Sequence, residues 1–220
     1  MATWTVHLRI AQKFIDKFSF LDTKEFIAGS LAPDCGYKIS ERTFNPPPKV
    51  THFSKTGMKN DCDYKEFANR YLLRAKNNKE HSFYLGYYIH LLTDILWSFI
   101  IYVPTYDMYG TDPNKNPEFI KKLRSDWSLM DAKYYCENSD FAALNILHSI
   151  TQVDDYIDFY ESGQIMFQLK EIISYYERHK QNPPRKSPKF ISKQKVDDFI
   201  NSAFETISLD LKNKKLDKPL

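Results

Sequence analysis

The sequence predicts an all-α fold: one helical bundle with a buried central helix, built as a single domain over residues 1–220. Apolar residues recur at three- and four-residue spacings in several segments, as expected for amphipathic helices. The chain is 42% apolar and has only six glycines, which disfavours a turn-rich β sandwich. One long segment, residues 83–103, is apolar on every side, as expected for a helix buried in a core.

The amino-terminal third predicts two helices followed by a loop. Residues 4–18 have the spacing of an amphipathic helix, with His7 on its apolar stripe. Thr23 is expected to cap a short second helix that stops before Pro33, because proline disfavours helical backbone in the residue ahead of it. Asp34 therefore lies just past a helix end.

Residues 35–61 are polar and include a run of three prolines, so they are expected to form a long loop. His52 lies inside this loop, next to Phe53, in a small aromatic island that could fold back onto the body. Loops of this length are often functional. A further helix is expected from residue 64 to about residue 75.

The central segment, residues 83–103, has only two strongly polar side chains, His90 and Asp94. It is long enough to span a bilayer. However, it stands alone, lacks basic flanks and has both polar groups near its middle, where a lone membrane helix tolerates them poorly. We therefore expect a core helix and no transmembrane segment.

The second half of the chain predicts further helices. Pro117 is expected to open one of them, with Asp126 inside its apolar stripe. His81 and His179 have polar neighbours in the sequence, so both are expected at the surface. The remaining helical patterns cover residues 141–150, 154–160, 164–179 and 195–209.

The charge balance identifies no partner. The 31 basic and 28 acidic residues are spread along the chain, so there is no strong nucleic-acid signal. Three cysteines without a paired CxxC spacing favour a reducing compartment. The first residues lack the basic and apolar regions of a secretory signal, and a cytoplasmic location is expected.

His90 and Asp94 are four residues apart, so their side chains leave one face of the same helix. An unpaired charge is costly in such an apolar helix, and two interpretations remain open: a structural hydrogen bond or a metal site. His7, Asp34 and His52 are further ligand-type residues in unusual apolar or helix-end positions. Together the five favour a metal site.

Four segments resemble the successive metal-ligand motifs of zinc-dependent phospholipase C proteins, a family similar in architecture to single-strand-specific nucleases. They are WTVH at 4–7, AGSLAPD at 28–34, THF at 51–53 and FYLGYYIHLLTD at 83–94. The resemblance implies that Asp34, His52, His90 and Asp94 surround one metal. It implies that His7 and Asp94 approach a second one, with Asp94 as the bridge. One or two zinc ions are expected, and manganese or iron also suits these ligands.

The chain departs from the family pattern in two places. Secreted members present a tryptophan at the mature terminus as a ligand, whereas Trp4 is internal. The family's downstream HxxxE motif is also missing, since the candidate HSITQ at 148–152 has glutamine in place of glutamate. Asp126 is a candidate replacement carboxylate, or else a partner for a buried tyrosine or a lysine.

These features predict a metal-dependent hydrolase of phosphoric esters, a phospholipase C-like phosphodiesterase in which a metal-activated hydroxide attacks phosphorus. Its substrate would be a small-molecule or lipid phosphate ester. Asp34 is the candidate catalytic residue, because it could bind metal and also orient or deprotonate the water. Phe53 and Tyr87 are candidates for an apolar wall. The alternative is a non-catalytic helical protein that keeps part of the site to bind metal or another ligand.

Overall fold

The computed structural model describes residues 2–40, 43–109, 117–138 and 140–219. Nearly all of its regular structure is helical. In this part of the chain the one sheet is a two-stranded antiparallel hairpin of β1 (Tyr37–Lys38) and β2 (Phe44–Asn45). The predicted all-α fold is confirmed.

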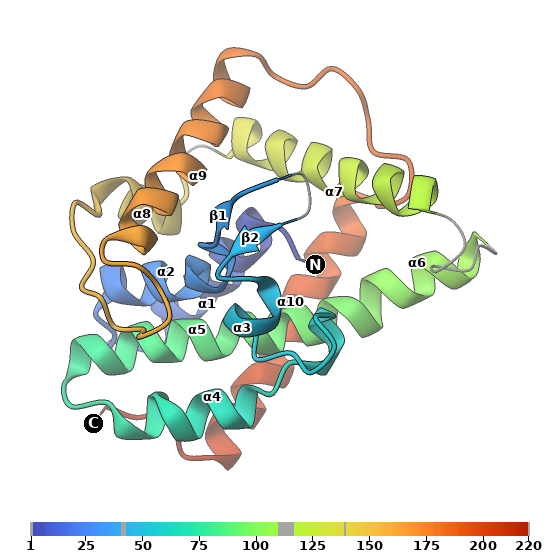
Figure 1. The fold of residues 1–220 in the computed structure, drawn as a ribbon. Coiled ribbons are helices and arrows are strands. Elements are labelled where there is room, and N and C mark those ends of the chain that lie inside the picture. The colour runs from blue at the N-terminus through green and yellow to red at the C-terminus, as the bar shows by residue number, and fades with distance from the viewer. Residues whose placement is uncertain (1, 41–42, 110–116, 139, 220) are drawn as a thin grey trace.

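A long central helix, α5 (Asn78–Trp97), crosses the molecule (Figure 1). It continues through a π-helical turn, η4 (Ser98–Tyr102), into α6 (Val103–Met108). The combined span, Asn78–Met108, is long and apolar enough to cross a membrane, and 61% of its most apolar window is buried inside the molecule. Core helices of globular proteins pass the same test, and α5 is buried without interruption from His81 to Asp94.

Two glycines allow α2 (Thr23–Leu31) to pack directly on α5. A Cβ added at Gly29 would lie 1.9 Å from the carbonyl oxygen of Phe83, and one at Gly86 would lie 2.3 Å from that of Phe26. Both distances are far inside van der Waals contact. Only glycine therefore permits this backbone approach, which places α2 against the middle of α5.

The start of α2 differs slightly from the prediction. The N-cap is Asp22, not Thr23, and its side chain accepts a hydrogen bond from the backbone N–H of Glu25 at 3.3 Å. Pro33 does not end the helical path abruptly, because a 3-10 turn, η1 (Ala32–Asp34), follows α2. This turn carries Asp34 to the end of the helix, as the sequence predicts.

The predicted loop over residues 35–61 contains regular structure. Besides the β1–β2 hairpin it includes α3 (Pro48–Thr51) and a 3-10 turn, η2 (Lys59–Asp61). The fully buried Gln164 holds the hairpin in place, since its amide donates to the carbonyl oxygens of Cys35 and Asn45 at 3.0 and 2.7 Å. The residues that form these hydrogen bonds are far apart in sequence, so local sequence patterns could not predict them.

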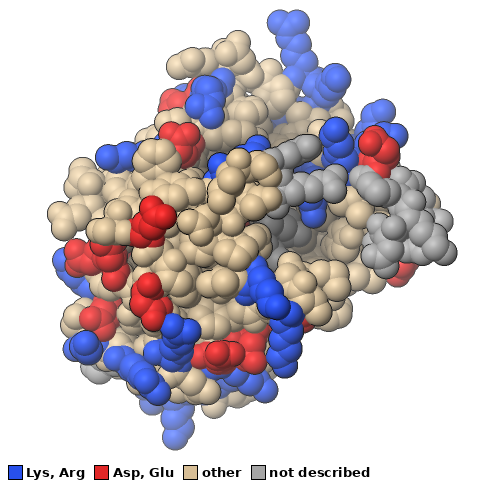
Figure 2. Space-filling view, viewed as in Figure 1, with Lys and Arg blue, Asp and Glu red and all other residues tan. Residues whose placement is uncertain are grey.

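The remaining helices surround α5, together with α1 (Trp4–Lys17). They are α4 (Tyr64–Arg70), η3 (Leu72–Arg74), α7 (Pro117–Glu137), α8 (Ala142–Ser149), α9 (Gln164–Gln181) and α10 (Lys193–Asn213). Acidic and basic side chains are interspersed on the face shown in Figure 2.

The predicted helix over residues 154–160 is wrong, because this segment is irregular. Asp155 shows the reason. Its carboxylate accepts hydrogen bonds from the Ser162 hydroxyl at 2.5 Å and the Gly163 backbone at 2.9 Å, just before α9 begins. Aspartate commonly competes with helix formation through such local bonds.

Candidate metal centre

Five ligand-type side chains from four segments meet in the interior. His7 comes from α1, Asp34 from the end of η1, His52 from the C-cap of α3, and His90 and Asp94 from α5. The three histidines and Asp94 are almost fully buried, and the Asp34 side chain is 7% exposed. The structure thus brings together every candidate ligand from the amino-terminal half of the chain.

Asp94 lies in the middle of this cluster. Its Oδ2 is 3.5 Å from the Nε2 atoms of both His52 and His90. Its Oδ1 is 3.7 Å from His7 Nε2 and accepts a 2.9 Å hydrogen bond from the backbone N–H of Ala2. The two oxygens of one carboxylate therefore face different histidines, as a bridging ligand requires.

The orientation of His90 is determined by α2. Its Nδ1 lies 2.8 Å from the carbonyl oxygen of Ser30, an atom that can only accept, so Nδ1 carries the proton and Nε2 presents a lone pair to the cluster. Burial, and secondly the neighbouring His7, lower the pKa of His90 to about 4. The ring is therefore neutral at pH 7, which is the form that binds metals.

His52 is positioned by its own loop and by α5. Its Nδ1 pairs with the Thr51 hydroxyl at 2.9 Å, and the Tyr87 hydroxyl donates to the Thr51 carbonyl oxygen. Phe53 adopts a left-handed backbone, with φ of 51°, and its ring packs on Phe67. A non-glycine residue in this region is uncommon and marks a turn held by its surroundings.

The cluster contains several buried nitrogens that lack hydrogen bonds. Among the described residues, both ring nitrogens of His7 and the Nε2 atoms of His52 and His90 have no partner. Burying such groups unsatisfied is costly, and a metal ion would satisfy them. Two overlapping groups have ligand atoms within 4.8 Å of one another: His7, His90 and Asp94, and Asp34, His52 and His90. These imidazole and carboxylate ligands fit zinc.

Residues 6–212 match the family described as zinc dependent phospholipase C. The chain belongs to the zinc-dependent phospholipase C family. No curated protein and no solved structure gives a significant match. The family match extends far beyond the first hundred residues, where the quoted motifs lie. It supports a metal-dependent, phospholipase C-like function with zinc as the metal, for which the His7, His90 and Asp94 group provides ligands.

Asp126 does not join the zinc cluster. Both of its oxygens accept backbone hydrogen bonds, from Lys189 at 2.6 Å and from Phe190 at 2.7 Å. The carboxylate therefore anchors the segment before α10 to α7. The sequence predicted either a metal-ligand role for Asp126 or a pairing with a tyrosine or lysine side chain, and neither is found. The groups that Asp126 contacts are main-chain N–H groups, which no sequence pattern marks.

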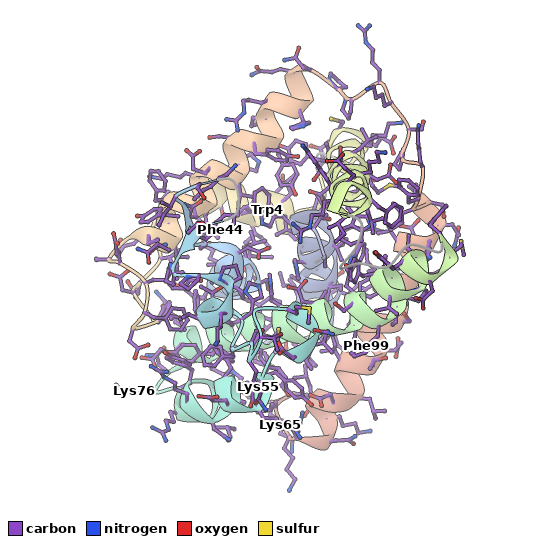
Figure 3. All side chains as sticks on the ribbon, turned by 45° about the vertical axis from the view of Figure 1, so that its right-hand side comes forward. Trp4, Phe44, Lys55, Lys65, Lys76 and Phe99 are labelled. Carbon is purple, nitrogen blue, oxygen red and sulfur yellow. The ribbon has the colours of Figure 1, made fainter. Side chains whose placement is uncertain are left out.

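Two other residues, Tyr87 and His81, differ from the expectations, whereas Trp4 agrees with them. The Trp4 ring, labelled in Figure 3, is partly buried and packs edge-on against Tyr175 and Tyr176 at the margin of the core. Tyr87 is fully buried and stacks on Phe67, so it positions the His52 loop and forms no exposed wall. His81 is 4% exposed, although its sequence neighbours are polar.

Sequence reasoning missed the groups that hold the family's zinc ligands in place. The Ser30 carbonyl and the Ala2 N–H are backbone atoms, and their residue types carry no sign of the role. The Tyr87 hydroxyl contacts no zinc ligand directly, because it donates its hydrogen bond to the carbonyl oxygen of Thr51, the residue before His52. One sequence feature could have predicted part of this arrangement. Each of the α2 and α5 motifs contains a glycine, Gly29 and Gly86, and small residues on two helices suggest that the helices pack closely.

Proposed function

We propose that the chain is a metal-dependent hydrolase of phosphoric esters, a phospholipase C-like phosphodiesterase acting on a small-molecule or lipid phosphate ester. The observation that carries this proposal is the buried cluster around Asp94, where three histidines with unsatisfied ring nitrogens face two carboxylates. Family membership supports the same class of chemistry.

Each residue has a distinct role in this proposal. His7, His52 and His90 would hold the metal through ring nitrogens, and Asp94, which lies between them, would offset its positive charge. When bound, zinc lowers the pKa of a coordinated water and neutralises charge on the phosphoryl oxygens. Asp34 is the least buried of the five, and its carboxylate lies 3.4 Å from His52 Nε2, so we assign it the role of orienting the attacking water and accepting its proton.

A specific observation favours the non-catalytic alternative. His148, the only histidine near the position of the family's downstream motif, is partly exposed and lies 3.8 Å from Glu177. It therefore does not extend the cluster on α5. In this alternative, a site limited to the five residues holds zinc with every position filled by protein, and such closed sites are structural.

The experiment is to compare zinc content and phosphodiester hydrolysis in the wild type, Asp94→Asn and Asp34→Asn. Asp158→Asn, which removes an exposed carboxylate paired with Arg70, is the matched control. Circular dichroism verifies that each variant folds. Bis-p-nitrophenyl phosphate and phosphatidylcholine serve as substrates.

We expect Asp94→Asn to lose most of its zinc and its activity. Asp34→Asn should keep much of the zinc but hydrolyse about 100-fold more slowly, a typical effect of removing a general base. Wild-type protein that holds zinc and hydrolyses neither substrate would support the non-catalytic alternative. Wild-type protein that holds no zinc after reconstitution would overturn the proposed zinc hydrolase and the metal-binding form of the alternative.

A further inference from the structure

The α8–α9 segment, residues 150–163, is irregular but attached to the amino-terminal half of α5 (Figure 1). The Tyr156 ring packs against Phe83 with centroids 4.8 Å apart, and the Tyr156 carbonyl oxygen accepts a 2.9 Å hydrogen bond from the Tyr84 hydroxyl. Four residues later in this segment, Tyr160 is 9% exposed. Contacts with the central helix, and not a helix of its own, therefore set the course of the chain towards Tyr160.

The Tyr160 hydroxyl reaches the turn that carries Asp34. It donates a hydrogen bond of 2.5 Å to the carbonyl oxygen of Ala32. Ala32 is the first residue of η1 and Asp34 is the last, so one 3-10 turn joins this carbonyl to the Asp34 carboxylate. The same carbonyl oxygen accepts from the backbone N–H of Cys35 at 2.9 Å, which closes the turn. The Tyr160 hydroxyl therefore anchors the turn from which the Asp34 side chain leaves.

Tyr87 has the corresponding contact with the turn that carries His52. Its hydroxyl donates to the carbonyl oxygen of Thr51, the residue before His52. The hydroxyl groups of Tyr87 and Tyr160 also interact directly with each other. Burial raises the pKa of both phenols well above their ordinary value of 10, so both keep their hydrogens at pH 7. The two tyrosines thus connect the turn of Asp34 to the turn of His52.

These two turns supply two of the three members of one ligand group. Asp34 Oδ1 and His52 Nε2 are 3.4 Å apart, and His90 completes the group. The other group, His7, His90 and Asp94, comes from α1 and α5 and contains no residue of either turn. Groups that hold metal ligands in place typically change metal affinity about 10- to 100-fold when they are removed. A change at the tyrosine pair should therefore affect one ligand group more than the other.

We propose that Tyr160 is a positioning residue for Asp34. Through the Ala32 carbonyl it holds η1 where the Asp34 carboxylate and the His52 ring can bind the same metal ion. Its contact with Tyr87 keeps the two ligand-bearing turns at a fixed separation. This role rests on the zinc site of the proposed function, but it requires no hydrolysis, so it can be measured on metal binding alone.

The test compares zinc affinity in the wild type, Tyr160→Phe and Tyr84→Phe, by competition with a chelating dye. The visible spectrum of the cobalt(II)-substituted proteins reports the geometry of the ligands. Tyr160→Phe removes one hydroxyl and keeps the ring. Tyr84→Phe is the matched control, because it also loses a bond from a hydroxyl to a backbone carbonyl of the α8–α9 segment, and that carbonyl, of Tyr156, is in neither ligand-bearing turn. Urea unfolding of the zinc-free proteins compares their stabilities.

We expect Tyr160→Phe to weaken one zinc-binding step about tenfold, at the lower end of such effects, and to shift the cobalt absorption bands. Tyr84→Phe should keep the wild-type zinc affinity and spectrum. The urea midpoints of the two zinc-free variants should fall by similar amounts, because each variant loses one hydrogen bond of the same kind. Weaker zinc binding at equal stability distinguishes positioning from a general loss of structure.

A double-mutant cycle with Asp34→Ala provides a second test. If Tyr160 acts through Asp34, Tyr160→Phe should weaken zinc binding little further once the Asp34 carboxylate is gone. Three results would overturn the inference and leave the zinc site intact: wild-type affinity in Tyr160→Phe, an equal loss in Tyr84→Phe, or a full tenfold loss in the Asp34→Ala background. Wild-type protein that binds no zinc would instead overturn the zinc site itself, and this inference with it.

Discussion

The imidazole rings of His7 and His90 stack face to face, with centroids 3.7 Å apart and planes 5° from parallel. The two rings come from α1 and α5, and the Nε2 atoms of both lack a hydrogen-bond partner among the described residues. Their contact joins the start of the chain to the central helix. His7 belongs to one ligand group, with His90 and Asp94. The other group consists of Asp34, His52 and His90 and does not contain His7.

His7→Phe should therefore lower the zinc content without abolishing it. Phenylalanine keeps a flat ring on His90 but has no ligand atom, so only the group that contains His7 is lost. We expect roughly half of the wild-type zinc by mass spectrometry, as for a site with two ions. His179→Phe, at the end of α9, is the control. Unchanged zinc content in His7→Phe would show that His7 is not a ligand.

Gly86→Ala should destabilise the fold strongly. The added methyl group would collide with the Phe26 backbone of α2 at 2.3 Å, and backbone atoms cannot move aside as a flexible side chain can. We expect a loss of about 3 kcal/mol in urea unfolding, at the upper end of overpacking effects. Gly57→Ala is the comparison, because Gly57 has positive φ and open space around it. It should lose only about 1 kcal/mol. Equal losses would contradict the steric explanation.

Asp126→Ala should lower stability and leave zinc content unchanged. The substitution removes the acceptors of the Lys189 and Phe190 backbone N–H groups. We expect a loss of about 2 kcal/mol, the usual effect of losing a hydrogen bond to a charged group. Asp126→Asn, which keeps one acceptor oxygen, should lose less. A fall in zinc content with normal stability would restore the ligand role.

Stability should decrease at mildly acidic pH, partly because of His81. Burial lowers the pKa of His81 from its ordinary value of 6.5. The unfolded chain therefore takes up a proton near pH 6.5 while the folded chain resists it. The stabilisation by neutral His81 is fully present above pH 6.5, and it is lost as pH falls towards the lowered pKa.

His81→Gln removes this titration. Between pH 7 and pH 5 the free energy of unfolding should fall less in His81→Gln than in the wild type. Urea unfolding at several pH values measures it, with His179→Gln as the control for loss of a less buried imidazole. The same pH dependence in all three proteins would show that His81 titrates normally.

The helices and most of the candidate site were readable from local patterns. The spacing in α1 and the apolar run in α5 predict both helices, because hydrophobic periodicity reflects which face is buried. His90 and Asp94 share a face through their four-residue spacing alone. The motifs around His7, Asp34 and His52 also identified the other three members of the cluster, through the resemblance to a family that the chain proved to belong to.

Other features depend on contacts between residues distant in sequence. The role of Asp126 and the burial of His81 were predicted wrongly for this reason, whereas the irregular backbone at 154–160 reflects local hydrogen bonds of Asp155. Trp97 and Trp127 are ordinary core tryptophans in a local pattern. Only the tertiary structure brings the two rings edge-on against each other, with centroids 5.6 Å apart.

Local spacing along the chain was thus sufficient for the all-α class and for placing His90 and Asp94 on one helix face, whereas His7, Asp34 and His52 were identified as ligands through the family resemblance. The arrangement of Asp94 between three histidines required the tertiary fold. It depends on two glycines that let α2 approach α5 and on backbone groups of Ser30 and Ala2. Backbone atoms are the same in every residue, so no sequence pattern distinguishes the ones that orient a ligand.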